Sequence, residues 1–369
     1  MVRTATTVEA SRPGALDLAL EAERLGLDVC WVAEAWGADA PTALGWLAGR
    51  TRRMLLGSGV IQVGTRSPVA VAQAARTLAE LSGGRFLLGL GASGPQVIEG
   101  LHGVAFGRPR TRLRETVEVV RMALAGEKVV YSGDTVTIPL PGGEGRPMRL
   151  SGTPFPDVPI YLATLSPRML RLTGEIADGW LGTSFVPEAA AAYLTDLDAG
   201  LASAGRTRAD LDVCQGAEVA FAADDGELAG MVDARRPGLA FSLGGMGSAT
   251  TNYYNAAYSR QGWGEVAARV RERWIDGDRA GAAALVTDEM VLATTLIGTE
   301  AMVRARLAVW QAAGVDTVRL YPAGETLDDQ VATLGRAIEL VREISTPESA
   351  RSAPPAGTPG AGGSGPPAP

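Results

Sequence analysis

Short apolar runs alternate with amphipathic helical stretches along most of the chain, and this alternation constrains the fold more than any other feature. The first apolar run spans 4–9, and leucine and alanine then recur at helical spacing over 13–25 until Gly26. Strands that alternate with helices pair in parallel, because each helix carries the chain back across the sheet. The pattern therefore predicts a parallel sheet covered by helices.

About eight strand–helix units follow one another. We expect strands over 4–9, 28–33, 54–60, 85–90, 159–163, 179–181, 211–221 and 317–321. We expect the helices of these units over 13–25, 41–50, 68–81, 108–125, 167–177, 187–204, 299–313 and 326–344. Eight units that close on themselves make an α/β fold of the (β/α)8 or TIM-barrel type, and an open doubly wound sheet is the alternative.

Some stretches lie outside these units. The Ser-Gly-Asp turn within 129–137 indicates a hairpin, and 234–290 is too long for one connection, so we expect a helical insertion near the active face. Residues 346–369 are mostly Pro, Gly, Ala and Ser, and cannot bury enough surface to offset the entropy of ordering. We therefore expect one barrel domain over 1–345 and a disordered tail.

Charge and cysteine usage narrow the class of protein. A formal net charge of −7 argues against nucleic acid or an anionic membrane as the main partner. Cys30 and Cys214 lie far apart in apolar runs, which is typical of buried thiols and not of a disulfide framework or a zinc site. The polar start of the chain and the lack of a long apolar run predict a cytoplasmic protein.

In a (β/α)8 barrel the chemistry gathers where the strands end, so the residues after each strand are the candidates. Trp31 lies within the second strand and is expected to pack in the core. Glu34 and Trp36 follow that strand, and we favour a functional role for them over rim packing. After the third strand, Gln62-Val63-Gly64 could support a flat ring system, although an ordinary loop is an equal alternative.

The fourth strand is followed by Gly91-Ala92-Ser93-Gly94, whose glycines let the backbone approach a ligand and donate hydrogen bonds. This is not the dinucleotide fingerprint, because no G-x-G-x-x-G opens a first βαβ unit. Glu99 and His102 follow in the same loop. His102 is the only histidine, so a Ser-His-Asp triad could not form without it, and no G-x-S-x-G elbow is present. A single histidine also excludes a histidine-rich metal site. For His102, a role in binding a cofactor or substrate and a purely structural role are both open.

The fifth strand leads into Thr164-Leu165-Ser166, just before a helix that begins at Pro167. A helix N-terminus with free N–H groups suits a phosphate, although Ser166 would serve equally well as an ordinary N-cap. Arg168 in the first turn opposes the helix dipole, which makes better sense if an anion lies there.

Several motifs in fixed order resemble those of luciferase-like flavin and deazaflavin oxidoreductases. Ile176-Ala177-Asp178-Gly179-Trp180 is similar to the family's "ADGW" segment, and 82–91 is similar to its "SGGRF…GLG" strand. Gly298-Thr299-Glu300 and the segment 312–316 resemble its final α–β unit. The resemblance covers about residues 4–345 and implies a TIM barrel with an insertion.

Two further motifs resemble the branch of this family that uses coenzyme F420 and includes methylene-tetrahydromethanopterin reductase. These are the segment 94–100, and Gly244-Gly245-Met246-Gly247 followed by Asn252-Tyr253-Tyr254. The resemblance implies hydride transfer between F420 and an unsaturated small-molecule substrate, and a homodimer. An FMN-dependent monooxygenase and a non-catalytic cofactor-binding barrel are the alternatives.

The resemblance also implies site residues. The expected cofactor-binding set is Gln62, Val63, Gly64, Gly91, Ala92, Ser93, Gly94, Thr164, Leu165, Ser166, Arg168 and Gly182. Glu34, Glu99 and His102 are the candidates for moving a proton. A non-proline cis peptide is implied near Val63-Gly64. Glu34 is followed by Ala35 where some relatives carry a histidine, so histidine acid catalysis is not expected there.

Overall fold

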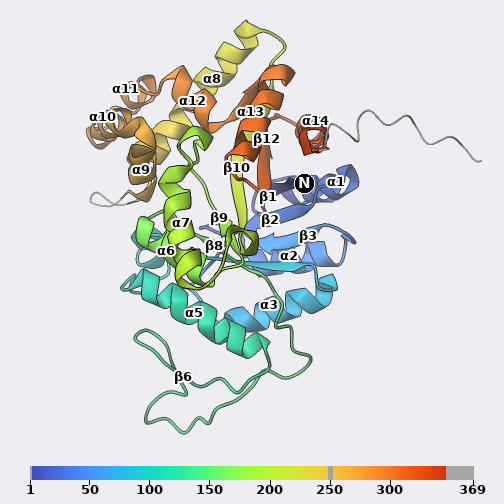
Figure 1. Ribbon diagram of the computed structural model, residues 1–369, viewed down its shortest axis with the longest axis vertical. Coiled ribbons are helices and arrows are strands. Elements are labelled where there is room, and N and C mark those ends of the chain that lie inside the picture. The colour runs from blue at the N-terminus through green and yellow to red at the C-terminus, as the bar shows by residue number, and fades with distance from the viewer. Residues whose placement is uncertain (1, 248–251, 346–369) are drawn as a thin grey trace, which may run out of the picture.

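Eight parallel strands close into a barrel surrounded by helices in the computed structural model, which describes residues 2–247 and 252–345 (Figure 1). The barrel strands are β1 Arg3–Glu9, β2 Val29–Ala33, β3 Leu55–Ser58, β5 Phe86–Gly91, β8 Ile160–Ala163, β9 Gly179–Leu181, β10 Asp212–Phe221 and β12 Thr317–Pro322. The ring is closed because β1 pairs with both β2 and β12, and β10 pairs with both β9 and β12. The predicted TIM barrel is confirmed.

The helices between the strands cover the outside of this barrel. They are α1 Ala15–Leu25, α2 Ala40–Ala48, α3 Pro68–Ser82, α5 Pro109–Leu124, α6 Pro167–Ile176, α7 Ala191–Ser203, α13 Glu300–Ala312 and α14 Leu327–Ser345. Local signals set their ends: Ser67 caps α3 by accepting from the Ala70 N–H, and Gly83 ends it at φ 67°. The buried faces of the helices and the outer faces of the strands form one large apolar core.

A group of helices separates β10 from β11 (Leu296–Gly298), a strand that pairs with the end of β10. These insertion helices are α8 Asp225–Ala240, α9 Tyr253–Tyr258, α10 Gly264–Ile275, α11 Arg279–Ala284 and α12 Asp288–Thr294. They enclose a small apolar core of their own and gather at one side of the barrel (Figure 1). The helical segment begins at α8, earlier than the expected residue 234.

Large side chains fill the half of the barrel nearer the amino ends of its strands. Trp31 is 1% exposed, and its ring centroid lies 5.0 Å from that of Tyr161. Gly57 makes room for the indole, since a Cβ there would be 2.3 Å from a ring carbon. Cys30 and Cys214 are free and buried, as expected, and burial raises the pKa of both thiols to about 12.

A polar network closes the amino end of the barrel. Arg3 forms an ion pair with Asp212 at 2.8 Å. The hydroxyl groups of Tyr161 and Thr317 donate to the same carboxylate at 3.0 and 2.9 Å. Because this network and the ring of Trp31 fill the barrel near the amino ends of its strands, a ligand site is expected at the carboxyl ends.

The expected hairpin is present as β6 Tyr131–Ser132 and β7 Thr137–Ile138, in an excursion that extends away from the barrel (Figure 1). The Glu115 carboxylate of α5 holds its turn by accepting from three backbone N–H groups, of Asp134, Thr135 and Val136, at 2.6–2.9 Å. These bonds fasten the excursion to the barrel's outer layer.

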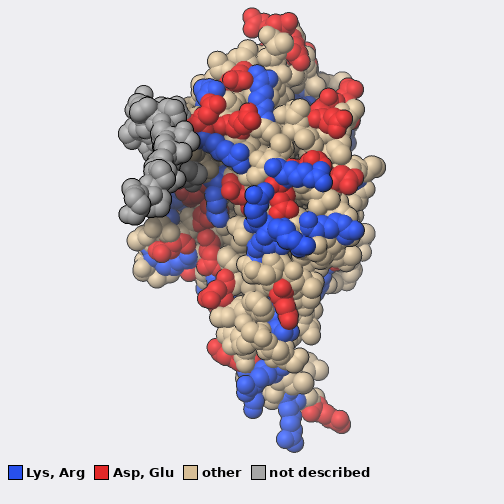
Figure 2. Space-filling model, turned by 90° about the vertical axis from the view of Figure 1, so that its right-hand side faces the viewer, with Lys and Arg blue, Asp and Glu red and all other residues tan. Residues whose placement is uncertain are grey.

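On the face shown in Figure 2, basic and acidic side chains are interspersed over the broad upper part, and both kinds are also present at the narrow lower end. Within the described residues, no helix is both long and apolar enough to cross a membrane.

Candidate functional site

The open end of the barrel begins with an interruption of the third strand. The peptide bond between Gly59 and Val60 is cis, and the chain then resumes as β4 (Ile61–Gln62), which pairs with the end of β5. The expectation of a cis bond near Val63-Gly64 was wrong in position. The strand breaks after Ser58, so Val63 and Gly64 instead form the turn that follows β4.

Val60, Gly91 and Ala163 form an apolar surface at this end of the barrel, here called the apolar shelf. A Cβ on Gly91 would lie 2.7 Å from Val60 Cγ2 and 3.6 Å from Ala163 Cβ, and a Cβ on Gly89 would lie 3.4 Å from Val60 Cγ1. Gly91 therefore makes room for the Val60 side chain, whereas Gly89 makes room for the Ser58 carbonyl oxygen, which would lie 1.9 Å from its Cβ. This is a packing role that the glycine pattern alone did not indicate.

Beside the shelf, Gln62 is buried and donates from its amide nitrogen to the Ala35 carbonyl at 2.5 Å. Its Oε1 atom is enclosed and has no hydrogen-bond partner within the described part of the chain. An enclosed acceptor without a donor is costly, so this atom is suited to a ligand N–H or a water molecule.

Glu34 lies nearby, but its carboxylate is already engaged. One oxygen pairs with Arg66 at 2.6 Å, and the other accepts from the Ala40 N–H at 3.2 Å. Arg66 also pairs with Asp39 at 2.5 Å. Glu34 therefore ties the loop after β2 to the loop after β4.

The loop after β5 leads from Ala92 to the short helix α4 (Pro95–Ile98), with Gly94 as its N-cap. The Gln96 side chain donates a hydrogen bond to the carbonyl of Gly247, so the two motifs that resemble the F420 branch are in contact. Glu99 accepts from the Phe106 N–H at 3.0 Å, and the His102 side chain is exposed.

Three non-glycine residues with positive φ lie just beyond barrel strands: Ala35 at 41°, Ser93 at 59° and Ser184 at 55°. They follow β2, β5 and β9, which all end at the same side of the barrel. Such residues cost free energy, about 1–3 kcal/mol each, and tend to occur at functional sites. Their placement supports a site at the barrel mouth.

At the start of α6, the predicted phosphate residues are placed differently from one another. The Thr164 hydroxyl is buried against that of Thr173 at 2.8 Å, so it points into the core and is not free to bind a ligand as expected. Ser166 is the N-cap, makes no side-chain cap bond and is partly exposed. Arg168 is exposed, and the Leu165 carbonyl accepts from Arg260 of the insertion at 2.6 Å.

Arg260 was not singled out from the sequence. Its segment, Ser259–Trp263, is π-helical and is interrupted at Gly262, whose φ is 95°. That irregular turn carries the guanidinium to the α6 N-terminus. The only local signal was a glycine, Gly262, two residues after the arginine.

The far side of the mouth is built from β9, β10 and β12. The Gly182 carbonyl accepts from the guanidinium of Arg319 on β12. Glu218 of β10 pairs with Arg235 of α8, and burial raises the pKa of this carboxyl group. Sequence reasoning missed both Glu218 and Arg319 because their strands were interpreted as core. A charged residue inside an otherwise apolar run was the available signal.

The model of the luciferase-like monooxygenase family matches residues 2–317 of this chain. The chain belongs to the luciferase-like monooxygenase family. Rv3520c of Mycobacterium tuberculosis, by name a candidate coenzyme F420-dependent oxidoreductase, is 39% identical over 331 residues, which cover 87% of this chain and 93% of that protein. The 5,10-methylenetetrahydromethanopterin reductase of Archaeoglobus fulgidus is 30% identical, with 86% of this chain and 92% of that protein covered.

Solved structures share the fold of this luciferase-like protein. The coenzyme F420-dependent tetrahydromethanopterin reductase of Methanopyrus kandleri superposes with a TM-score of 0.71 at 24% identity, covering 92% of this chain and 97% of that one. The oxygenating constituent of 3,6-diketocamphane monooxygenase from Pseudomonas putida, in complex with FMN, reaches 0.67 at 16% identity, with 93% and 98% covered.

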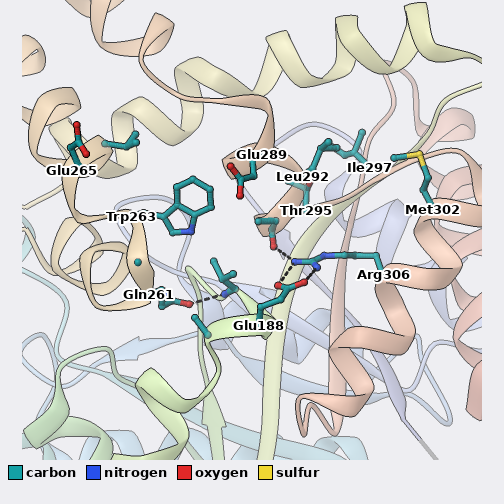
Figure 3. Close-up of a pocket in the computed structure, with 15 residues that line it drawn as sticks. Glu188, Gln261, Trp263, Glu265, Glu289, Leu292, Thr295, Ile297, Met302 and Arg306 are labelled. Carbon is teal, nitrogen blue, oxygen red and sulfur yellow. Dashed lines mark hydrogen bonds and ion pairs between the residues drawn. The ribbon is translucent and has the colours of Figure 1, made fainter.

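The luciferase-like protein also has a cavity of about 1130 Å³ between the insertion, the loop after β9 and α13, and none of the predicted site residues lines it (Figure 3). Figure 3 shows Trp263 on one side of it and the ion pair of Glu188 with Arg306 on the other. Gln261 lies in its wall, accepts from the Val186 N–H at 2.7 Å and donates to the Ser184 carbonyl at 2.6 Å. This amide fastens the insertion to the loop after β9.

Proposed function

We propose that this protein is an F420-dependent oxidoreductase that transfers a hydride between the deazaflavin and an unsaturated small-molecule substrate. The observation that carries the proposal is the hydrogen bond from Gln96 to Gly247. It joins two motifs that both resemble the F420-dependent branch and lie far apart in sequence. The name of one relative that aligns with more than four-fifths of this chain supports the same cofactor.

The residues at the mouth fit such a cofactor. The apolar shelf of Val60, Gly91 and Ala163 suits the face of a flat ring, and the enclosed Oε1 of Gln62 suits a ring N–H. Val63, Gly64, Ala92, Ser93 and Gly94 line the adjoining turns. When bound, the deazaflavin would supply the hydride chemistry, while the protein orients the reactants and excludes water.

The phosphate of the cofactor is assigned to the N-terminus of α6. The free hydroxyl of Ser166 and the first-turn N–H groups would donate to it. Arg168 and Arg260 would supply positive charge, and Arg260 is already held against the Leu165 carbonyl. Thr164 would contribute through its backbone only, since its hydroxyl is occupied by Thr173.

Glu34, Glu99 and His102 are the proposed proton carriers. The engagement of Glu34 with Arg66 makes it the least free of the three. Glu99 and His102 lie in the exposed loop between α4 and α5. Single variants Glu34→Gln, Glu99→Gln and His102→Ala separate them, because loss of the true carrier removes one limb of the pH dependence of kcat/KM.

Titration of the purified protein with F420 and with FMN tests the cofactor. We expect F420 to bind at least about tenfold more tightly than FMN. Ser166→Ala should weaken F420 binding without lowering the melting temperature. Ser67→Ala is the matched control, because Ser67 caps the equivalent proline-started helix α3 and should affect stability only.

Tighter binding of FMN would favour the alternative, an FMN-dependent monooxygenase on the same barrel. No binding of either cofactor would overturn both assignments. We also propose a homodimer, which sedimentation of the purified protein tests directly.

A further inference from the structure

Arg319 of β12 is a buried cation without a carboxylate partner. Arg319 is 6% exposed, and one nitrogen of its guanidinium donates a hydrogen bond to the Gly182 carbonyl. Its Nε is enclosed and has no hydrogen-bond partner, and no Asp or Glu among the described residues forms an ion pair with it. A buried charge that lacks a counter-ion is strongly unfavourable, so this arrangement is incomplete by itself.

The guanidinium lies on the inner face of the barrel, toward its mouth. Thr317 on the same strand contacts Asp212 inside the barrel, whereas Val318 and Leu320 face the outer core. Alternation along the strand therefore turns Arg319 inward. Its bond to Gly182, just beyond the end of β9, places the guanidinium at the open end.

The path of the side chain crosses β10 at a glycine. Gly216 is the register partner of Arg319, and a Cβ there would lie 2.5 Å from the Tyr321 hydroxyl. The missing side chain lets groups from β12 reach across toward β9. Glu218, the next inward position on β10, is already paired with Arg235 and is not the counter-ion of Arg319.

Arg3 provides an internal comparison. It also projects from a barrel strand toward the axis, but its charge is compensated by Asp212 at 2.8 Å. It therefore needs no ligand. Arg3, at the closed end, has its carboxylate, whereas Arg319, at the open end and less exposed to solvent, has none among the described residues.

We propose that Arg319 binds an oxyanion, a carboxylate or a phosphate, that the substrate carries. A planar guanidinium suits either group, because two parallel N–H donors match two oxygens. This proposal rests on the proposed function and names the substrate class for that site. The phosphate of the cofactor is assigned elsewhere, at the start of α6, and β9 and β10 separate that helix's strand, β8, from β12.

The test uses thermal unfolding of the full chain with inorganic phosphate as the probe, with and without F420. Phosphate should raise the melting temperature of the wild-type protein in both states. Arg319→Met should raise the melting temperature without phosphate, by about 2 °C or more, because it removes an uncompensated buried charge. With F420 bound, so that the proposed phosphate site at α6 is filled, the same variant should lose the phosphate-induced shift. Its F420 dissociation constant should stay within about twofold of the wild-type value.

Arg3→Met is the matched control. It removes the paired inner arginine, so it should lower the melting temperature and keep the phosphate-induced shift. Arg319→Lys keeps the charge but not the planar fork, and should retain less than half of the shift, roughly. If Arg319→Met does not fold, the phosphate-induced shift of Arg319→Lys tests the proposal instead.

Two results would overturn the proposal. One is a phosphate-induced shift that is absent in the wild type or unchanged in the Arg319 variants. The other is an F420 dissociation constant that rises about tenfold or more in Arg319→Met, since the oxyanion would then belong to the cofactor. Failure of F420 to bind the wild type would instead contradict the proposed function, and the phosphate measurements on the cofactor-free protein would still judge Arg319.

Discussion

The side chain of Val60 occupies the space that a side chain on Gly91 would need, with only 2.7 Å between Val60 Cγ2 and the Cβ position of the glycine. This contact joins the interrupted third strand of the barrel to β5. It makes the shape of the mouth depend on a valine and a glycine from different strands.

Gly91→Ala should therefore displace the Val60 side chain and change the shape of the apolar shelf. We expect F420 affinity to fall about tenfold, with a loss of stability of about 1–3 kcal/mol from overpacking. Fluorescence titration with F420 and chemical unfolding measure the two effects.

A second substitution makes this explanation specific. Val60→Ala combined with Gly91→Ala removes the clash, so the double variant should recover stability relative to Gly91→Ala alone. Gly45→Ala in α2 is the control, because no atom lies within 4 Å of its Cβ position and a helical alanine stabilises by about 0.5–1 kcal/mol. An additive double variant would contradict the contact.

Arg260→Met should weaken F420 binding by about tenfold, because it removes a cation held at the N-terminus of α6. Arg269→Met is the control, as Arg269 lies exposed on α10 of the same insertion. Equal effects of the two variants would show that only the overall charge of the insertion matters. Raising the salt concentration should narrow the difference between wild type and Arg260→Met.

Gln261→Ala should loosen the insertion helices from the barrel. The amide contacts the Val186 N–H, the Ser184 carbonyl and the Tyr193 hydroxyl. The last two also bond to each other, so loss of the amide leaves the buried Val186 N–H unpaired and costs about 1–3 kcal/mol. Hydrogen exchange should become faster in α9 and α10. Gln311→Ala on the exposed face of α13 should leave both exchange and stability unchanged.

Glu115 gives a pH-dependent prediction. Although burial opposes its ionisation, hydrogen bonds from the Thr135 hydroxyl and from three backbone N–H groups lower the pKa of the carboxyl group. Its stabilising effect is therefore complete above the unfolded pKa of about 4.3 and disappears as the pH falls through the lower folded value.

Glu115→Gln should lower the free energy of unfolding by about 1–3 kcal/mol at neutral pH. When the pH is lowered from 5, the variant should also lose less free energy of unfolding than the wild type, as measured by urea unfolding. A variant with the same acid sensitivity as the wild type would rule out this carboxylate as the source.

Much of the barrel followed from periodicity. The strand at 85–90 is apolar on both faces because helices and the barrel interior cover it, and it was predicted within one residue at each end. The helix from Pro68 was equally clear, because a serine cap and a glycine stop are local signals. The short strands β4 and β11 were not predicted, since two or three residues carry no detectable period.

The side-chain contacts at the candidate site were harder to predict than the fold, for a physical reason. Alternation shows which side of a strand a residue occupies, but not what its side chain meets. Thr164 follows a barrel strand as expected, yet it faces α6 and bonds to Thr173. Arg319 could not be recognised as a site residue, because the absence of a counter-ion is visible only once the whole barrel is assembled.

Filling of the barrel near the amino ends of its strands by Trp31 and by the network around Asp212 has a kinetic consequence. Two molecules that share a well with one opening must leave in the reverse order of their arrival. Under the proposed function, a reactant that lay beneath the other would therefore bind first and leave last, and initial-rate kinetics would show a compulsory order.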